Sequence, residues 1–123
     1  MLIAQISDCH ITEPGGLVAE RVDSAPGLER AVAYLVGLGD AIDLIVASGD
    51  LANDGRPGEY DRLAELLAPL AALRADLVGL PGNHDDRAEV RSRFALVPDG
   101  DGPIDHVVER DGYRVVCLDT TVP

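Results

Sequence analysis

Three short polar segments of this chain carry side chains that can bind a metal ion. They are Asp8-Cys9-His10, Gly49-Asp50 and Gly82-Asn83-His84-Asp85. Each follows a short apolar run, and neighbouring segments are about one β-α-β unit apart. Carboxylate and amide oxygens and imidazole nitrogens are ligands that suit Mn, Fe or Zn. The types and spacing of these residues predict a metal site built from Asp8, His10, Asp50 and Asn83.

Two metal ions in such a site would suit the hydrolysis of a phosphoester. Carboxylates gathered in one crevice repel one another and raise one another's pKa values, and cations remove that repulsion. Two cations about 3.5–4 Å apart generate hydroxide and stabilise both the attacking and the leaving oxygen. Asp50 is the expected bridge between the ions, because it follows the middle of the three apolar runs.

Each segment taken alone also has a plainer interpretation. Asp8 and His10 could form a turn at the end of a strand, and Gly49-Asp50 is a common turn sequence. Residues 82–85 could be a polar loop that caps the next helix. The metal interpretation therefore depends on whether the fold brings all three segments together.

Four other residues near the segments have structural interpretations. Cys9 is expected to be a core thiol, because strand-like alternation points it away from Asp8 and His10. Arg87 and Arg91 lie four residues apart on an expected helix, and solvated surface is favoured over contact with a phosphate. Asp119 is expected to organise a turn.

Three parallel strands would bring the segments together. The apolar runs Leu2–Ile6, Leu44–Ala47 and Leu77–Leu80 predict buried strands. Helical apolar spacing predicts helices between them, one from Ser24 to Gly39 and one from Glu59 to about Leu73 that Pro69 kinks or shortens. Strands joined by helices are parallel with right-handed crossovers. Ligands bind at the carboxyl ends of such strands, where the three polar segments lie.

The last third of the chain has a different pattern. A short helix is expected at 87–94, followed by a β-hairpin in which 104–109 and 113–118 flank Asp111-Gly112. The whole chain, 1–123, is expected to form a single α/β domain with a mostly parallel sheet and a C-terminal hairpin.

Composition and charge exclude several partners. The chain has 22 acidic and 10 basic residues and a net charge of −12, so it should repel long nucleic acid and anionic membranes. It has no apolar run long enough to cross a bilayer and no signal-peptide pattern at its start. Two cysteines without a secretory signal indicate free thiols in a reducing compartment, and a cytoplasmic location is expected.

The three segments in this order resemble the calcineurin-like metallophosphoesterase family. Within that family, the stretches 48–55 and 81–87 and the ending Leu118-Asp119-Thr120-Thr121-Val122-Pro123 resemble bacterial class III cyclic-nucleotide phosphodiesterases. The resemblance covers nearly the whole chain. It implies a phosphodiesterase that cuts a small phosphodiester, a 3',5'-cyclic nucleotide first and a glycerophosphodiester next, by metal-activated hydroxide.

The resemblance also implies a role for each residue. Asp8 and His10 would bind the first of two divalent ions of the Fe, Mn or Zn type, Asp50 would bridge both, and Asn83 would bind the second. His84 would meet the phosphate and protonate or stabilise the leaving oxygen. Two further roles complete the set: Asp85 would orient the His84 ring, and Asn53 would lie near the substrate.

The chain departs from the family in its histidines. The family has a later histidine and a Gly-His-x-His motif that complete both metal shells, whereas this chain contains His10, His84 and His106. The resemblance therefore implies the N-terminal half of a four-layer α/β/β/α sandwich, truncated on its C-terminal side. Such a half is expected to self-associate or to pair with the missing half. The alternative is a non-catalytic remnant or binding module that keeps a partial metal site.

Overall fold

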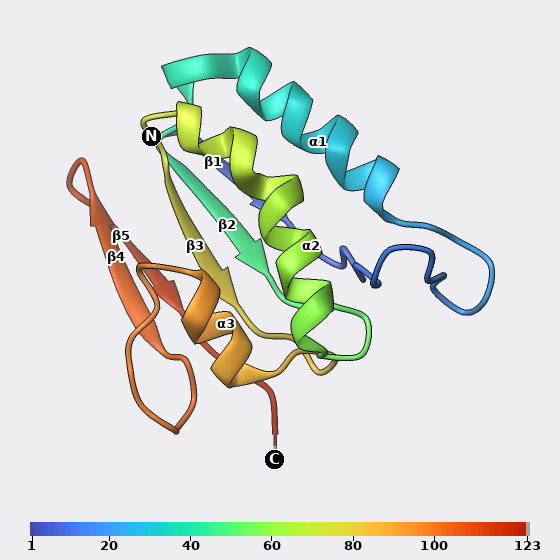
Figure 1. Cartoon of the computed structure of the whole chain (residues 1–123). Helices are drawn as coiled ribbons and strands as arrows, with labels where there is room; N and C mark the ends of the chain where they lie inside the picture. The colour runs from blue at the N-terminus through green and yellow to red at the C-terminus, as the bar shows by residue number, and fades with distance from the viewer. Residues whose placement is uncertain (123) are drawn as a thin grey trace.

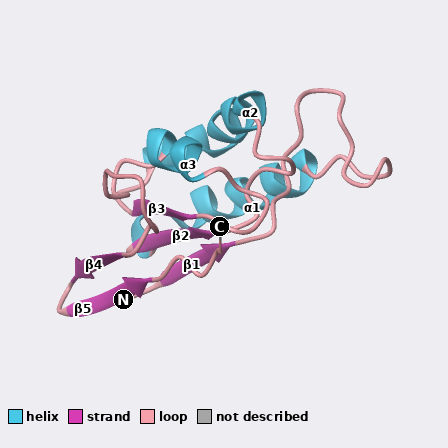
Figure 2. Ribbon diagram, turned by 90° about the horizontal axis from the view of Figure 1, so that it is seen from below, coloured by secondary structure: helices cyan, strands magenta, loops and turns pink. Residues whose placement is uncertain are grey.

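The structure is a computed structural model that describes residues 1–122. The chain has an α/β fold in which the helices lie on one side of a parallel sheet (Figure 1, Figure 2). Pro123, the last residue of the stretch that resembles the family, lies outside the described residues. The sheet contains β1 (Ile3–Ile6), β2 (Leu44–Ser48) and β3 (Asp76–Leu80), in the order β1-β2-β3. The expected α/β class with a parallel sheet is confirmed.

The predicted hairpin is present as a separate antiparallel pair, β4 (His106–Arg110) and β5 (Tyr113–Cys117). Asp111 and Gly112 form its turn, with φ angles of 51° and 78°. Positive φ at both central positions is what a tight hairpin turn requires, and Asp-Gly tolerates it well.

Three helices connect and follow the strands: α1 (Ala25–Leu38), α2 (Pro57–Leu67) and α3 (Arg87–Arg93). Short 3-10 turns extend the first two, at Gly39–Ala41 and Ala68–Ala72. The second of these turns contains Pro69, which confirms the expected shortening of α2. No helix within residues 1–122 is both long enough and apolar enough to cross a bilayer.

The parallel strands are aligned so that their carboxyl ends lie level. Ile6 pairs with Ala47, and Ala47 pairs with Gly79. The face toward the helices holds the larger core, in which Ile45 packs with Leu28, Tyr60 and other buried residues of α1 and α2. Because the strands end together, the segments that follow them emerge at one edge of the sheet.

The opposite face of the sheet is covered only in part. Leu44, Val46 and Val78 form a second apolar cluster with Cys117, against which Val108 and Val115 of the hairpin also pack. An ion pair between Arg110 and Asp76 joins the hairpin to the start of β3.

The strand β1 lies at the edge of the sheet. Ile3 and Gln5 are exposed, although their partners in the register are the buried Leu44 and Val46. The expectation that the first strand is fully buried is therefore wrong. An edge strand has a neighbour on one side only, and the cluster under the hairpin draws its sheet residues from β2 and β3.

Candidate metal site

The three polar segments meet at the carboxyl edge of the sheet. The backbone N–H of Asp8 donates to the Gly49 carbonyl at 3.0 Å, and that of His10 donates to the Asp50 carbonyl at 2.9 Å. A Cβ atom added to Gly49 would lie 3.0 Å from the Gly82 backbone, so the segments after β2 and β3 are also in contact. The parallel order predicted from the sequence thus brings all three into one place.

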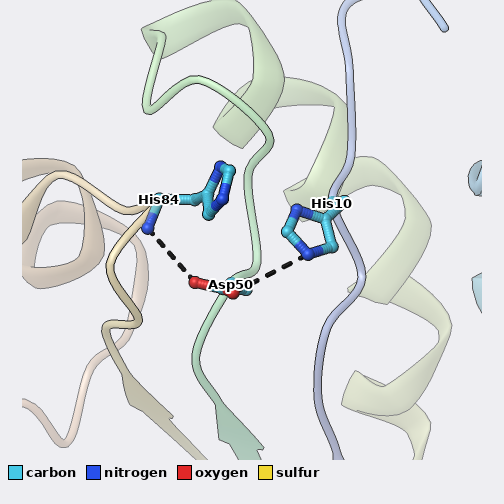
Figure 3. A group of neighbouring side chains, drawn as sticks. All are labelled: His10, Asp50 and His84. Carbon is cyan, nitrogen blue, oxygen red and sulfur yellow. Dashed lines mark hydrogen bonds and ion pairs between the residues drawn. The ribbon is translucent and has the colours of Figure 1, made fainter. Parts of the chain in front are cut away.

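Side chains from all three segments form one compact group of metal-ligand types, His10, Asp50 and His84 (Figure 3). Ligand atoms of these residues lie within 4.8 Å of one another. The distance from His10 Nε2 to Asp50 Oδ2 is 3.7 Å, and the backbone N–H of His84 donates to Asp50 Oδ1 at 3.1 Å. Asp50 thus offers one carboxylate oxygen to the His10 ring and the other to the backbone N–H of His84. The two imidazole rings contact each other edge-on, with their centroids 4.8 Å apart.

The backbone at three of the expected ligands is held in the left-handed region. The φ angles are 54° at Asp8, 43° at His10 and 49° at Asp50. Such angles are uncommon outside glycine and cost free energy unless the surroundings impose them, and they concentrate at functional sites. At His10 the support includes Ser24, the residue before α1, whose hydroxyl donates to the His10 carbonyl at 2.9 Å. Ser24 occupies the N-cap position of α1, but its hydroxyl makes no capping hydrogen bond and fixes this turn instead.

The side chain of His10 fits the role of a metal ligand. Its Nδ1 atom is buried and has no hydrogen-bond partner among the described residues. A buried polar nitrogen without a partner is destabilising, and a ligand that uses it or reorients the ring removes that cost. The imidazole nitrogens of His10 and His84 around one carboxylate form a mixed N/O set that suits Mn, Fe or Zn.

The other two expected ligands, Asp8 and Asn83, lie in the loops after β1 and β3. The carboxylate of Asp8 is exposed and is not among the group that meets within 4.8 Å. Asn83 is exposed beside His84. It lines a polar cleft of about 480 Å³ together with Arg87, Arg91 and Thr121.

The ring of His84 is held by Asn53 and not by Asp85, the residue expected to orient it. The Nδ1 atom of His84 lies 2.6 Å from the Asn53 carbonyl oxygen. The Asp85 carboxylate instead accepts hydrogen bonds from three backbone N–H groups and one phenol. These donors occupy both of its oxygens, which explains the difference. Asn53, expected near the substrate, touches His84 through its backbone.

Arg87 is not the solvated surface residue that the sequence favoured. Its Nε donates to Asp119 Oδ2 at 2.7 Å, and its Nη2 donates to Thr121 Oγ1 at 2.7 Å. Asp119 is fully buried, so the expected turn residue is also the partner of an ion pair. Thirty-two positions separate the two in the chain, and nothing in the local pattern links them.

Cys9 agrees with its interpretation as a core thiol. Its side chain is buried, and burial, with the charges of Asp85 and Asp8, raises the pKa of the thiol to about 11. The thiol is therefore protonated at neutral pH and is a poor metal ligand.

Comparison with known proteins identifies the class to which this fold and site belong. The family model for calcineurin-like phosphoesterases matches residues 1–119. The chain belongs to the calcineurin-like phosphoesterase family.

Several relatives have names that specify a phosphodiester. The chain is 39% identical to the cAMP/cGMP dual specificity phosphodiesterase of Mycobacterium tuberculosis, over 99% of this chain and 39% of that protein. It is 34% identical to the 3',5'-cyclic adenosine monophosphate phosphodiesterase CpdA of Pseudomonas aeruginosa, over 100% of this chain and 43% of that protein. A third relative, the glycerophosphodiester phosphodiesterase GpdQ of Enterobacter lignolyticus, is 41% identical over 72% of this chain and 31% of its own length. The chain thus spans about two-fifths of the length of the first two.

Proposed function

We propose that this chain carries the N-terminal part of a two-metal phosphodiesterase site that acts on a 3',5'-cyclic nucleotide. The observation that carries the proposal is the meeting of His10, Asp50 and His84 at the carboxyl edge of the sheet, where the two imidazole rings contact each other edge-on and the Asp50 carboxylate lies beside them. The names of two relatives specify cyclic nucleotides. Residues 1–123 would form one domain together with the part that supplies the remaining ligands.

The proposed ligand roles are those that the family resemblance implies, and the contacts of His84 support its part in them. Asp8 and His10 would hold one divalent ion, Asn83 the other, and Asp50 both. When bound, the ions would lower the pKa of a water molecule and neutralise charge on the phosphate. His84 would donate a hydrogen bond or a proton to the leaving oxygen from Nε2, because its Nδ1 already faces the Asn53 carbonyl. That contact selects the tautomer with the proton on Nδ1 in the neutral ring, so Nε2 donates when the ring is charged.

The charge and shape around the site favour a small substrate. The net charge of −12 opposes the approach of a long polyanion. The polar cleft beside Asn83 has a volume of about 480 Å³, enough for a ligand of mononucleotide size. Glycerophosphodiesters are the nearest other substrates, as the name of the third relative suggests.

A non-catalytic binding module is the second candidate. The observation that favours it is the small set of histidines: His106 lies in β4, outside the compact group, which leaves two imidazoles at the site. Such a chain would bind an ion without turnover.

Metal analysis and a product assay on the same sample would separate the two candidates. The purified chain would be dialysed against Mn, analysed for bound metal, and incubated with cyclic AMP or a glycerophosphodiester. Bound metal with formation of a nucleoside monophosphate supports the enzyme, and bound metal without product supports the binding module. A chain that retains no metal under any condition would contradict both.

A further inference from the structure

A half-buried carboxylate, Asp85, accepts hydrogen bonds from two loops of the candidate site. It accepts from the backbone N–H groups of Leu51 at 3.1 Å, Ala52 at 2.9 Å and Gly82 at 2.8 Å. Leu51 and Ala52 belong to the loop after β2, and Gly82 belongs to the loop after β3. Hydrogen bonds to an ionised acceptor are shorter and stronger than neutral ones. One side chain therefore holds both loops.

A third element reaches the same carboxylate through Tyr60 of α2. The Tyr60 side chain is fully buried. Its hydroxyl donates to Asp85 Oδ1 at 2.9 Å and accepts from the backbone N–H of Asp86 at 2.8 Å. Burial, and then the charge of Asp85, raise the pKa of this phenol above its ordinary value, so it remains a donor at neutral pH. The helix thereby fixes the position of the carboxylate.

The backbone groups that Asp85 holds are the immediate neighbours of the expected metal ligands. Leu51 follows Asp50, and Gly82 precedes Asn83. Between the same two loops, the His84 N–H donates to Asp50 Oδ1. A movement of either loop would change the distance between Asp50 and the pair Asn83-His84.

We propose that Tyr60 and Asp85 are positioning residues that set the distance between the two ligand-bearing loops of the metal site. The inference rests on the proposed function, because it assigns these residues to the geometry of that site. Metal-ligand distances must hold to about 0.2 Å, and groups that orient ligands typically contribute 10–100-fold to metal affinity. Loss of the phenol hydroxyl should therefore weaken metal binding, although this hydroxyl bonds to Asp85 and Asp86 and not to a proposed ligand.

The test compares Tyr60→Phe with two control variants in calorimetric titrations with Mn. Tyr34→Phe removes the same atom from an exposed ring on α1, and Val32→Ala weakens the core from α1 without removing any hydrogen bond to Asp85. We expect Tyr60→Phe to lower Mn affinity about 10–100-fold. Tyr34→Phe should bind Mn with the affinity of the unaltered chain. The folded fraction of Val32→Ala should bind Mn with that affinity too. Equal affinity for Tyr60→Phe and the unaltered chain would overturn the inference.

A second measurement needs no metal, so it separates this inference from the proposed function. Hydrogen exchange of the amides of Leu51, Ala52 and Gly82 reports directly on the bonds to Asp85. We expect faster exchange at these three amides in Tyr60→Phe, with little change at the β2 core amide of Ile45. Unchanged exchange at all three would refute the positioning role. If the unaltered chain binds no Mn but exchange responds as expected, the proposed function fails and the positioning role of the pair stands.

Discussion

Asp50 is the residue on which metal binding should depend most. Its carboxylate lies 3.7 Å from the His10 ring through one oxygen and accepts from the backbone N–H of His84 through the other. With part of the family's ligand set present, we expect this chain to bind one Mn ion weakly and a second scarcely at all. Asp50→Ala should abolish detectable binding in a calorimetric titration, because it removes the ligand proposed to bridge both ions.

The control for Asp50→Ala is Asp54→Ala, which removes a nearby exposed carboxylate outside the compact group. It should bind Mn like the unaltered chain. Two tight sites in the unaltered chain, or binding that survives Asp50→Ala, would contradict the assigned ligands.

Gly82 provides a steric test of the same site. A Cβ atom at this position would overlap the Asp50 carboxylate and backbone nitrogen. Gly82→Ala should therefore push the two loops apart and lower Mn affinity by at least the roughly 10–100-fold expected for loss of a positioning contact. The same titration on Gly37→Ala is the control, because a Cβ there meets nothing within 4 Å and the residue lies in α1. Gly37→Ala should stabilise the chain by about 0.5–1 kcal/mol in urea unfolding and leave affinity unchanged.

At the scale of elements, the ion pair between Arg87 and Asp119 fastens α3 to the segment after β5. Asp119 also accepts from the N–H groups of Ile104 at 2.9 Å and Thr121 at 3.0 Å, so one buried carboxylate joins three parts of the chain. Its burial opposes ionisation, but the hydrogen bonds from Arg87, Thr121 and Ile104 outweigh that effect and hold the pKa of Asp119 well below its usual value.

This lowered pKa makes the contribution of Asp119 to stability depend on pH. The contribution is present above the unfolded-state pKa of about 3.9 and is lost as the pH falls below it toward the folded-state value. Asp119→Asn removes the titrating group. In urea unfolding, the stability difference between the unaltered chain and Asp119→Asn should be larger at pH 7 than at pH 3.

The matched control for this pair is Asp101→Asn, an exposed carboxylate in the loop before β4. The stability difference between the unaltered chain and Asp101→Asn in urea unfolding should be the same at pH 7 and at pH 3. A difference for Asp119→Asn that is equally large at pH 3 would mean that the carboxylate does not act through its ionised form.

The sequence predicted the elements better than the contacts between them. Hydrophobic spacing and turn residues are local signals, and they placed every strand and helix to within about two residues except the end of α2, which stops at Leu67 before the 3-10 turn Ala68–Ala72. The partial exposure of β1 was not predicted, because an apolar run does not reveal whether a strand has one neighbour or two. The partners of Asp85 and Arg87 were also missed, because they depend on loops that are distant in the sequence. Because Asp85 follows His84 in the sequence, the two side chains were expected to pair. In the fold, the Asp85 carboxylate accepts hydrogen bonds from backbone N–H groups instead.

At the scale of the whole molecule, the outer face of the hairpin holds exposed apolar side chains beside the ion pair of Glu109 and Arg114. Val107 and Val116 pair across the two strands and are 51% and 58% exposed, and Leu118 after β5 is 62% exposed. Soluble monomers seldom expose large contiguous apolar patches. We expect the chain alone to self-associate through this face, or to pair with the part of its relatives that it does not span.

Light scattering across a range of concentrations would test this expectation. Val116→Ser should reduce the apparent mass at high concentration, whereas Tyr34→Ser, which removes an exposed apolar side chain from α1, should not. A monodisperse monomer with a sharp cooperative melt in the unaltered chain would contradict it. In that case residues 1–123 would form a closed core, and the half-sandwich picture would be wrong.

The three residues of the compact group come from separate segments of the chain, so ion binding is linked to folding. His10, Asp50 and His84 meet only after β1, β2 and β3 have paired, so the unfolded chain cannot present them together. An ion that binds the folded form alone therefore stabilises it by mass action, by about 2.7 kcal/mol at 100 times the dissociation constant. We expect the melting temperature to rise with Mn and to fall again when EDTA is added, and the rise should vanish in Asp50→Ala. A melting temperature indifferent to Mn would mean that the folded chain holds no ion. The concentration of an ion that binds only the folded chain would therefore set the ratio of folded to unfolded chain, and the ion would bind only when the three strands are paired in the right order.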